Sequence, residues 1–436
     1  MKRSRRVGRY HLLDRLGSGG MADVYRGKLV EADGAEQLFA MKRVIEMYAE
    51  DPTFVKMLVA EYRLSSMLQH PNIARIHELL RTPEGYFIVM EYVDGKDLRT
   101  TLTRGIENHR PLDVADAVYL MARAVDGLDH AHAAVTPEGA ALRLVHRDFS
   151  PSNILVGYDG SVKIIDFGIA KADIDRERTQ LGVIKGKVRY MSPEQAQGED
   201  RLTAQSDVFS AGSVLYEILA GTPAFHAPNE VELIYAVRRA SPRPLRELAP
   251  HVPEALEAVI ARAMAKTRRD RYPTAGAFRD DLVTFLRAHA PGYRRTRLAS
   301  YMKSLWAAAI EEELATLLEY ALSDAPAAPT ENLLAHVSVE ESMQEVAASL
   351  GPLFDRASVP PAPVRSGSGR RPLPTPLSGP APLVATRGPA VPVDDLFATS
   401  PAAPSWEDVH TEADHATDSM PFASSPPRPP TRDPRK

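Results

Sequence analysis

Residues 146–153 read HRDFSPSN, residues 166–168 read DFG, and these two segments decide the fold. The first places the carboxylate of Asp148 and the carboxamide of Asn153 on one short loop. Two strand-like runs lie between the segments, so a hairpin would bring Asp166 back beside Asn153. Carboxylate and amide oxygens suit Mg²⁺, and we therefore expect Asn153 and Asp166 to hold this ion. Either segment alone could arise by chance, whereas the pair in this order leaves little room for chance.

Further motifs resemble those of eukaryotic-like (Hanks-type) bacterial serine/threonine protein kinases, over about residues 10–288. They are a glycine-rich loop at 16–24 (LGSGGMADV), a strand ending in lysine at 39–42 (FAMK), GKVRYMSPE at 186–194 and DVFSAG at 207–212. The resemblance implies an α+β, bilobal protein kinase fold, with a small β-rich N-lobe containing one helix and a larger helical C-lobe. It also implies transfer of the γ-phosphoryl group of ATP to protein hydroxyls, with Asp148 accepting the proton.

The glycine-rich loop and the lysine after it have ordinary alternative interpretations. Glycines let backbone amides approach phosphate oxygens, but such a loop is equally a turn between two strands. Ala22 replaces the usual third glycine. A lysine after a strand is usually only solvated, yet the position of Lys42 after the loop favours contact with the α- and β-phosphates.

A helical period over residues 54–68 carries one carboxylate, Glu61. The resemblance implies that Glu61 forms an ion pair with Lys42. The alternative is a surface glutamate on an amphipathic helix, but no other acidic residue lies between Asp51 and His70.

The resemblance assigns the nucleotide site residue by residue. A strand at 86–93 would carry the gatekeeper Met90, and its backbone would bind adenine. Asp97 would reach the ribose, although a helix N-cap explains this residue equally well. The residues expected to bind ATP are Leu16, Gly17, Ser18, Gly19, Gly20, Met21, Ala22, Asp23, Val24, Ala40, Lys42, Met90, Glu91, Val93, Asp97 and Leu155.

Two positions depart from the family pattern. Ser150 stands where the family has a lysine that contacts the γ-phosphate, and Lys187 stands where it has a threonine. We expect Lys187 to supply the missing cation to Asp148 and the γ-phosphate; the alternative is an exposed loop cation. We also expect Thr179 to be the activating phosphosite, paired with Arg147.

Two structural motifs of the C-lobe follow from the same resemblance. The aspartate of the DVFSAG motif, Asp207, would anchor the catalytic loop from below. Arg271 would pair with Glu194 in a buried ion pair that is structural rather than catalytic.

Three classes of function remain open. An active protein serine/threonine kinase, autophosphorylating in signal transduction, is the first. A pseudokinase scaffold that binds nucleotide or partners is the second, and only Ser150 favours it. A small-molecule kinase is the third, and the peptide-positioning GKVRYMSPE segment argues against it.

Composition divides the chain of 436 residues into a basic segment at 1–9, a kinase domain at 10–288, a helical extension at 289–323 and a tail at 324–436. The extension has an apolar stripe that packs on the C-lobe or binds a partner helix. Nineteen of the 36 prolines lie in the tail after Leu350, so we expect the tail to be disordered, with docking of partners as an alternative. The formal net charge of −4 gives no case for nucleic acid. The absence of cysteine and of long apolar runs predicts a cytoplasmic protein without a membrane span.

Overall fold

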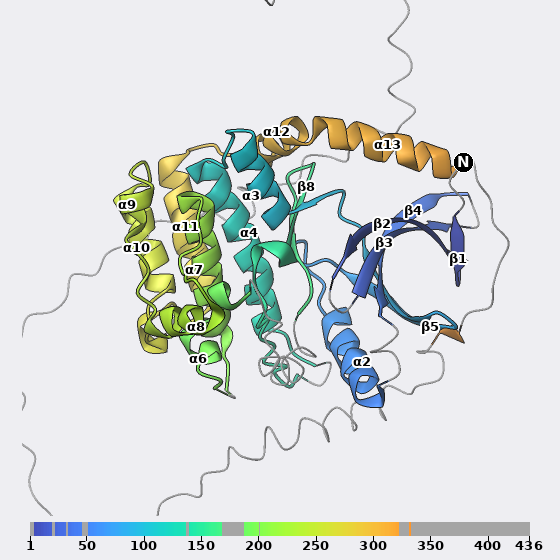
Figure 1. Ribbon diagram of the computed structural model, residues 1–436, viewed down its shortest axis with the longest axis horizontal. Coiled ribbons are helices and arrows are strands. Elements are labelled where there is room, and N and C mark those ends of the chain that lie inside the picture. The colour runs from blue at the N-terminus through green and yellow to red at the C-terminus, as the bar shows by residue number, and fades with distance from the viewer. Residues whose placement is uncertain are drawn as a thin grey trace, which may run out of the picture. The chain divides into compact units, whose positions relative to one another are not determined.

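The computed structural model describes residues 4–19, 22–31, 34–45, 51–136, 139–167, 187–199, 201–321 and 331–332. Within these residues the chain forms a β-rich N-terminal lobe followed by a helical C-terminal lobe (Figure 1). This arrangement confirms the predicted bilobal α+β fold. None of the helices in the described part of the chain combines the length and the hydrophobicity needed to cross a bilayer.

The N-lobe is an antiparallel sheet with the strand order β1-β2-β3-β4-β6-β5-β10. Its strands are β1 (Arg5–Val7), β2 (Tyr10–Ser18), β3 (Ala22–Val30), β4 (Glu36–Val44), β5 (Ile76–Thr82), β6 (Gly85–Glu91) and β10 (Glu331–Asn332). Strand β10 pairs with β5 through its backbone. The rest of the predicted tail at 324–436 lies outside the described residues.

Alternation along β4 decides where Lys42 points. Phe39 and Met41 belong to a core cluster on one face of the sheet. Ala40 and Val44 pack into a second cluster, which contains residues of α2 (Pro52–Ser66). Since successive side chains of a strand face opposite sides, Lys42 shares the α2 side with Ala40 and Val44. The strand thus directs this lysine toward the C-lobe side of the sheet, where the functional residues lie.

The C-lobe is built around α7 (Ala204–Ala220), in which every residue from 206 to 219 is buried. A helix that is buried on all sides belongs in the centre of a domain. The surrounding helices are α3 (Leu98–Glu107), α4 (Val114–His132), α6 (Pro193–Ala196), α8 (Glu230–Arg239), α9 (Leu245–Leu248), α10 (Glu254–Ala263) and α11 (Ala275–His289). A small sheet of β7 (Gly95–Asp97), β8 (Ile154–Gly157) and β9 (Val162–Ile164) lies beside them.

The helical extension forms two helices, α12 (Arg295–Leu305) and α13 (Ala307–Ala321). The first half of the predicted apolar stripe is buried, since Leu298 and Met302 are fully enclosed. For the second half, packing on the C-lobe is wrong, because Leu314 and Leu318 of α13 are exposed. The break at Trp306 rotates the helix, so a stripe drawn through both segments as one helix loses its phase.

Candidate active site

The loop that carries HRDFSPSN is fixed from beneath by Asp207 of α7. One carboxylate oxygen accepts a hydrogen bond of 2.7 Å from the amide of His146, and the other accepts one of 2.9 Å from the amide of Arg147. His132 of α4 contacts Asp207 through Nε2 at 2.7 Å. Burial acts to raise the pKa of Asp207, but His132 and the loop amides outweigh it and hold the pKa below its ordinary value. The predicted anchor is confirmed, whereas no motif in the sequence indicated a contact of His132 with Asp207.

Asp148 and Asn153 are locked to each other across the loop. The side-chain amide of Asn153 donates to the backbone oxygen of Asp148 at 2.8 Å and to its Oδ2 at 3.0 Å. Both amide hydrogens of Asn153 are therefore directed to Asp148. The oxygen of the same amide is the atom that remains to hold a cation.

A hairpin brings Asp166 to this loop, as the spacing predicted. Strands β8 and β9 pair with Ile154 opposite Ile164, and the amide of Ile165 donates to the backbone oxygen of Asn153 at 3.0 Å. Asp166 Oδ1 receives the ammonium group of Lys42 at 2.7 Å. Lys42 comes from β4 of the N-lobe, so this ion pair joins the two lobes at the predicted site.

The backbone at two site residues adopts the left-handed region. Asp166 has a φ of 57° and Arg147 a φ of 65°. Residues with a Cβ rarely adopt this conformation, which persists only where the surrounding contacts enforce it. Asp166 is itself one of the carboxylates that the sequence marked as functional, and Arg147 directly precedes the other, Asp148.

Glu61 of α2 lies on the same side of the sheet as Lys42, close to Asp166. Glu61 and Asp166 line one cavity together with Met90 and Phe167. Met90 is 8% exposed and forms part of the core between β6 and α2. The contact between Lys42 and Asp166 is the pairing that the structure gives for the lysine, and the expected ion pair with Glu61 stays a prediction.

Lys187 reaches the catalytic loop. Its ammonium nitrogen lies 2.5 Å from Oδ2 of Asp148, and the lysine side chain is 42% exposed while the aspartate is 12% exposed. Ser150 is buried, and its hydroxyl has no hydrogen-bond partner among the described residues. The cation near Asp148 thus comes from the GKVRYMSPE segment and not from the loop itself.

The segments expected to bind the nucleotide are described in part. The amide of Gly19 donates to the oxygen of Ala22 at 2.9 Å and closes the turn between β2 and β3; Gly20 and Met21 lie outside the described residues. In β6 the amide of Glu91 donates to the backbone oxygen of Arg75 at 2.8 Å, so this amide does not face a base. Asp97 caps α3 by accepting from the amide and the hydroxyl of Thr100, which supports the N-cap interpretation.

The donor set fits a magnesium ion that arrives with phosphate. Among the described residues, no three carboxylate, histidine or cysteine side chains gather in a group that could hold a metal by itself. Asn153 and Asp166 offer one amide oxygen and one carboxylate. Mg²⁺ is commonly held by one or two protein oxygens together with substrate phosphates and water, so this sparse set suits it.

Residues 10–283 match the family model described as the protein kinase domain. The chain belongs to the protein kinase family. It is 40% identical over 296 residues to a tyrosine-protein kinase, MasK of Myxococcus xanthus. The aligned residues make up 68% of this chain and 46% of that protein. It is 35% identical over 277 residues to the serine/threonine-protein kinase PrkC of Bacillus subtilis, covering 64% and 40%. It is 33% identical over 276 residues to a probable serine/threonine-protein kinase PknB of Lactococcus lactis, covering 63% and 42%. The chain thus spans less than half the length of these relatives.

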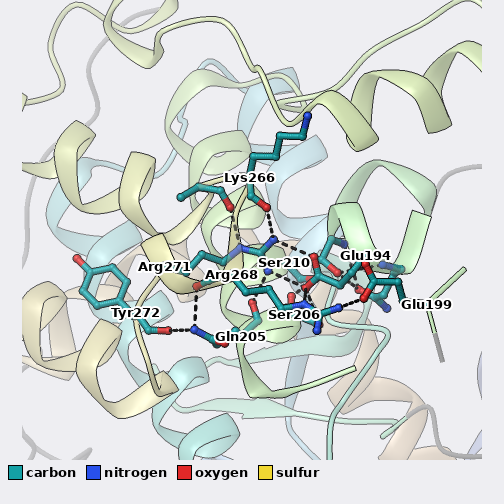
Figure 2. A network of polar contacts seen from close by, with 12 residues as sticks. Glu194, Glu199, Gln205, Ser206, Ser210, Lys266, Arg268, Arg271 and Tyr272 are labelled. Carbon is teal, nitrogen blue, oxygen red and sulfur yellow. Dashed lines mark hydrogen bonds and ion pairs between the residues drawn. The ribbon is translucent and has the colours of Figure 1, made fainter. Parts of the chain in front are cut away.

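In this chain the end of the GKVRYMSPE segment is held by a buried ion pair (Figure 2). Both terminal nitrogens of Arg271 donate to the carboxylate of Glu194, at 2.7 and 2.8 Å. The hydroxyl of Ser206 adds a third hydrogen bond at 2.7 Å. The predicted Arg271–Glu194 pair is therefore confirmed, and Ser206 is a partner that the sequence analysis missed.

One link between this segment and the catalytic loop was also missed. Gln195 donates from its side chain to the backbone oxygen of Arg147 at 2.8 Å. Ser192 and Gln195 form a capping box at the start of α6, and this S-x-x-Q pattern is readable from sequence. The pattern predicts the cap but not the contact with Arg147. Thr179, the expected phosphosite, lies outside the described residues.

Proposed function

We propose that this kinase transfers the γ-phosphoryl group of ATP to serine and threonine hydroxyls of proteins, its own chain included, in signal transduction. The observation that carries the proposal is the ion pair between Lys42 of β4 and Asp166, next to the locked pair of Asp148 and Asn153. It places one ammonium group, two carboxylates and one amide at the junction of the lobes. This is the equipment that phosphoryl transfer needs, because catalysis there is mainly positioning and charge stabilisation.

Each residue has a definite task in the proposed reaction. Lys42 neutralises charge on the phosphates, and Asn153 and Asp166 would hold Mg²⁺, which neutralises further charge when bound. Asp148 accepts a hydrogen bond from the acceptor hydroxyl and orients it. The hydroxyl oxygen then bonds to the γ-phosphorus, the bond to the bridging oxygen breaks, ADP leaves, and the proton passes to Asp148.

The proposal also specifies which hydroxyls accept the phosphoryl group, those of serine and threonine rather than tyrosine. Two of the relatives above are named serine/threonine kinases, and one is named a tyrosine kinase. We expect phosphoserine and phosphothreonine when the chain is incubated with labelled ATP and Mg²⁺ and its acid hydrolysate is separated. Asp148→Asn, run in parallel, should yield no label. Label confined to phosphotyrosine would overturn the serine/threonine assignment and leave the kinase assignment standing.

Lys187 is proposed to replace the lysine that the catalytic loop lacks at Ser150. An ammonium group 2.5 Å from Asp148 Oδ2 is also within reach of a phosphoryl group that approaches the same carboxylate. Lysine suits this task, because its point charge contacts phosphate without strict geometry. Since the side chain is partly exposed, solvent weakens the interaction.

We therefore expect Lys187→Thr to lower kcat by about tenfold, a loss set by one partly screened charge. The double variant Ser150→Lys with Lys187→Thr should recover much of this loss, because the cation returns to the loop. Steady-state kinetics of the two single variants and the double variant form the cycle. An unchanged kcat in Lys187→Thr would show that the phosphate is held without this lysine.

A pseudokinase scaffold is the second candidate, and the contact of Lys187 with Asp148 is what favours it. In this reading the ammonium group blocks the base, and the chain binds nucleotide without turnover. The Lys187→Thr variant separates the two functions. A scaffold would gain turnover from that change, whereas a kinase that uses Lys187 loses it.

A further inference from the structure

The extension after the kinase domain is firmly attached to the C-lobe. In α12, Leu298 and Met302 are fully buried, and the hydroxyl of Tyr301 donates to the oxygen of Arg110 at 2.8 Å. Arg104 of α3 donates to the oxygen of Leu305 at 3.0 Å. The guanidinium of Arg104 also lies over the ring of Trp306, 4.4 Å from its centroid. The start of α13 is therefore fixed to α3.

The middle of α13 contacts β7, which directly follows the hinge, the segment 92–94 that leads from β6 of the N-lobe into the C-lobe. Glu313 forms an ion pair with Lys96 of β7, and Tyr158 donates to the other carboxylate oxygen at 3.5 Å. Lys96 also lies 5.6 Å from the centroid of the Trp306 ring. Strand β7 follows β6 after a few residues and pairs with β8, which begins directly after Asn153. Glu313 thus holds the strand between the expected adenine and metal positions.

The end of α13 reaches the N-lobe. Tyr320 is 6% exposed, and burial together with the nearby carboxylate of Asp14 raises the pKa of its hydroxyl. Asp14 lies on β2 and forms an ion pair with Arg26 of β3 at 3.6 Å. The guanidinium of Arg26 in turn covers the ring of Tyr92, just after β6, at 5.2 Å. Figure 1 shows α13 running from the C-lobe helices to the strands of the N-lobe.

We propose that α12 and α13 form a strap across the hinge that sets the opening between the lobes, with Glu313 as a positioning residue for nucleotide binding. The inference rests on the proposed function only in that the nucleotide is ATP. A helix fixed at both ends resists the change of angle that opens the lobes, and so keeps the two halves of the site at binding distance. Free motion of the lobes would otherwise reduce the fraction of molecules able to bind.

The first test measures equilibrium binding of a non-hydrolysable ATP analogue to the full chain by calorimetry. Glu313→Gln should weaken binding about fivefold, at the low end of typical couplings between distant groups. Lys96→Gln should weaken it equally, and the double variant should lose no more than either single one, because both remove the same contact. Glu313→Asp should retain part of the affinity. Equal affinity in wild type and Glu313→Gln would overturn the proposal.

The matched control is Glu312→Gln. Glu312 is the exposed neighbour of Glu313 on the same helix, and no contact is found for it within the described residues. Glu312→Gln should bind the analogue like wild type. In Glu313→Gln, KM for ATP should rise, while kcat should change less. Loss of affinity in Glu312→Gln of the same size would refute a specific role for Glu313.

A second test measures the lobes directly and does not depend on turnover. The chain has no cysteine, so one cysteine at Val30 of β3 and one at Ile106 of α3, both exposed, can carry spin labels. Glu313→Gln should broaden the distance distribution between the labels relative to the parent, and Glu312→Gln should not. An unchanged distribution would contradict the strap, whether or not the chain transfers phosphate. A chain that binds nucleotide but transfers none would instead contradict the proposed function.

Discussion

Replacing Asp148 by asparagine should lower kcat/KM for phosphoryl transfer by at least about two orders of magnitude, which is typical for loss of a general base. Asparagine keeps the shape of the side chain, but it cannot accept the proton of the hydroxyl. Lys42→Ala and Asp166→Asn should each cause a loss of the same order, since each removes a preorganised charge.

Initial rates of transfer to a protein substrate at saturating Mg²⁺ measure these losses. Asp280→Asn, which changes an exposed carboxylate on α11, is the control and should leave the rate unchanged. Binding of the ATP analogue should persist in Asp148→Asn, because that residue meets the acceptor and not the nucleotide. Turnover near the wild-type rate in Asp148→Asn or Asp166→Asn would remove the residue from the proposed site.

Replacing Arg271 by glutamine should reduce the free energy of unfolding by about 3–5 kcal/mol, because it leaves the Glu194 carboxylate buried without its partner. Arg271 is fully enclosed, and Glu194 is 3% exposed. Arg268→Gln is the matched control, since Arg268 is partly exposed and lies 3.6 Å from the same carboxylate. Loss of this outer arginine should cost less than about 1 kcal/mol.

The acid dependence of the Arg271 effect has a definite sign. Burial would raise the pKa of Glu194, but the hydrogen bonds and charge of Arg271 lower it to about 2. A carboxylate with a lowered folded-state pKa stabilises the fold above its unfolded pKa, here about 4.5, and loses this effect as the pH falls toward 2. Urea unfolding at pH 7 and at pH 4 should therefore show a smaller difference between wild type and Arg271→Gln at the lower pH. A difference that grows on acidification would contradict the assigned charge state.

The parts of the site that the sequence predicted rest on one of two grounds. The hairpin from Asn153 to Asp166 depends on short-range geometry, and the pair of Arg271 and Glu194 depends on motifs that name both partners. The Lys187 contact could be predicted because two departures from one pattern, at Ser150 and Lys187, compensate each other in charge.

The parts that the sequence did not predict depend on packing between distant elements. His132 meets Asp207 because α4 and α7 lie side by side, and Gln195 meets Arg147 because the start of α6 lies against the HRDFSPSN loop. The exposure of Leu318 follows from the break between α12 and α13 at Trp306. Neither a capping residue nor a proline marks this break in the sequence. Composition shows that a helix forms there, while the neighbouring surface decides which face it presents.

Because the backbone at Asp166 is left-handed, different substitutions there can separate the effect of losing the charge from the cost of the backbone conformation. Asparagine visits this region readily, so Asp166→Asn changes the charge and leaves the local conformational energy almost as it was. Alanine adds a backbone cost of roughly 1–2 kcal/mol to the loss of charge, and glycine relieves that cost. An inactive Asp166→Gly that melts above the wild type would mean that natural selection has kept a less stable protein here for the sake of its chemistry.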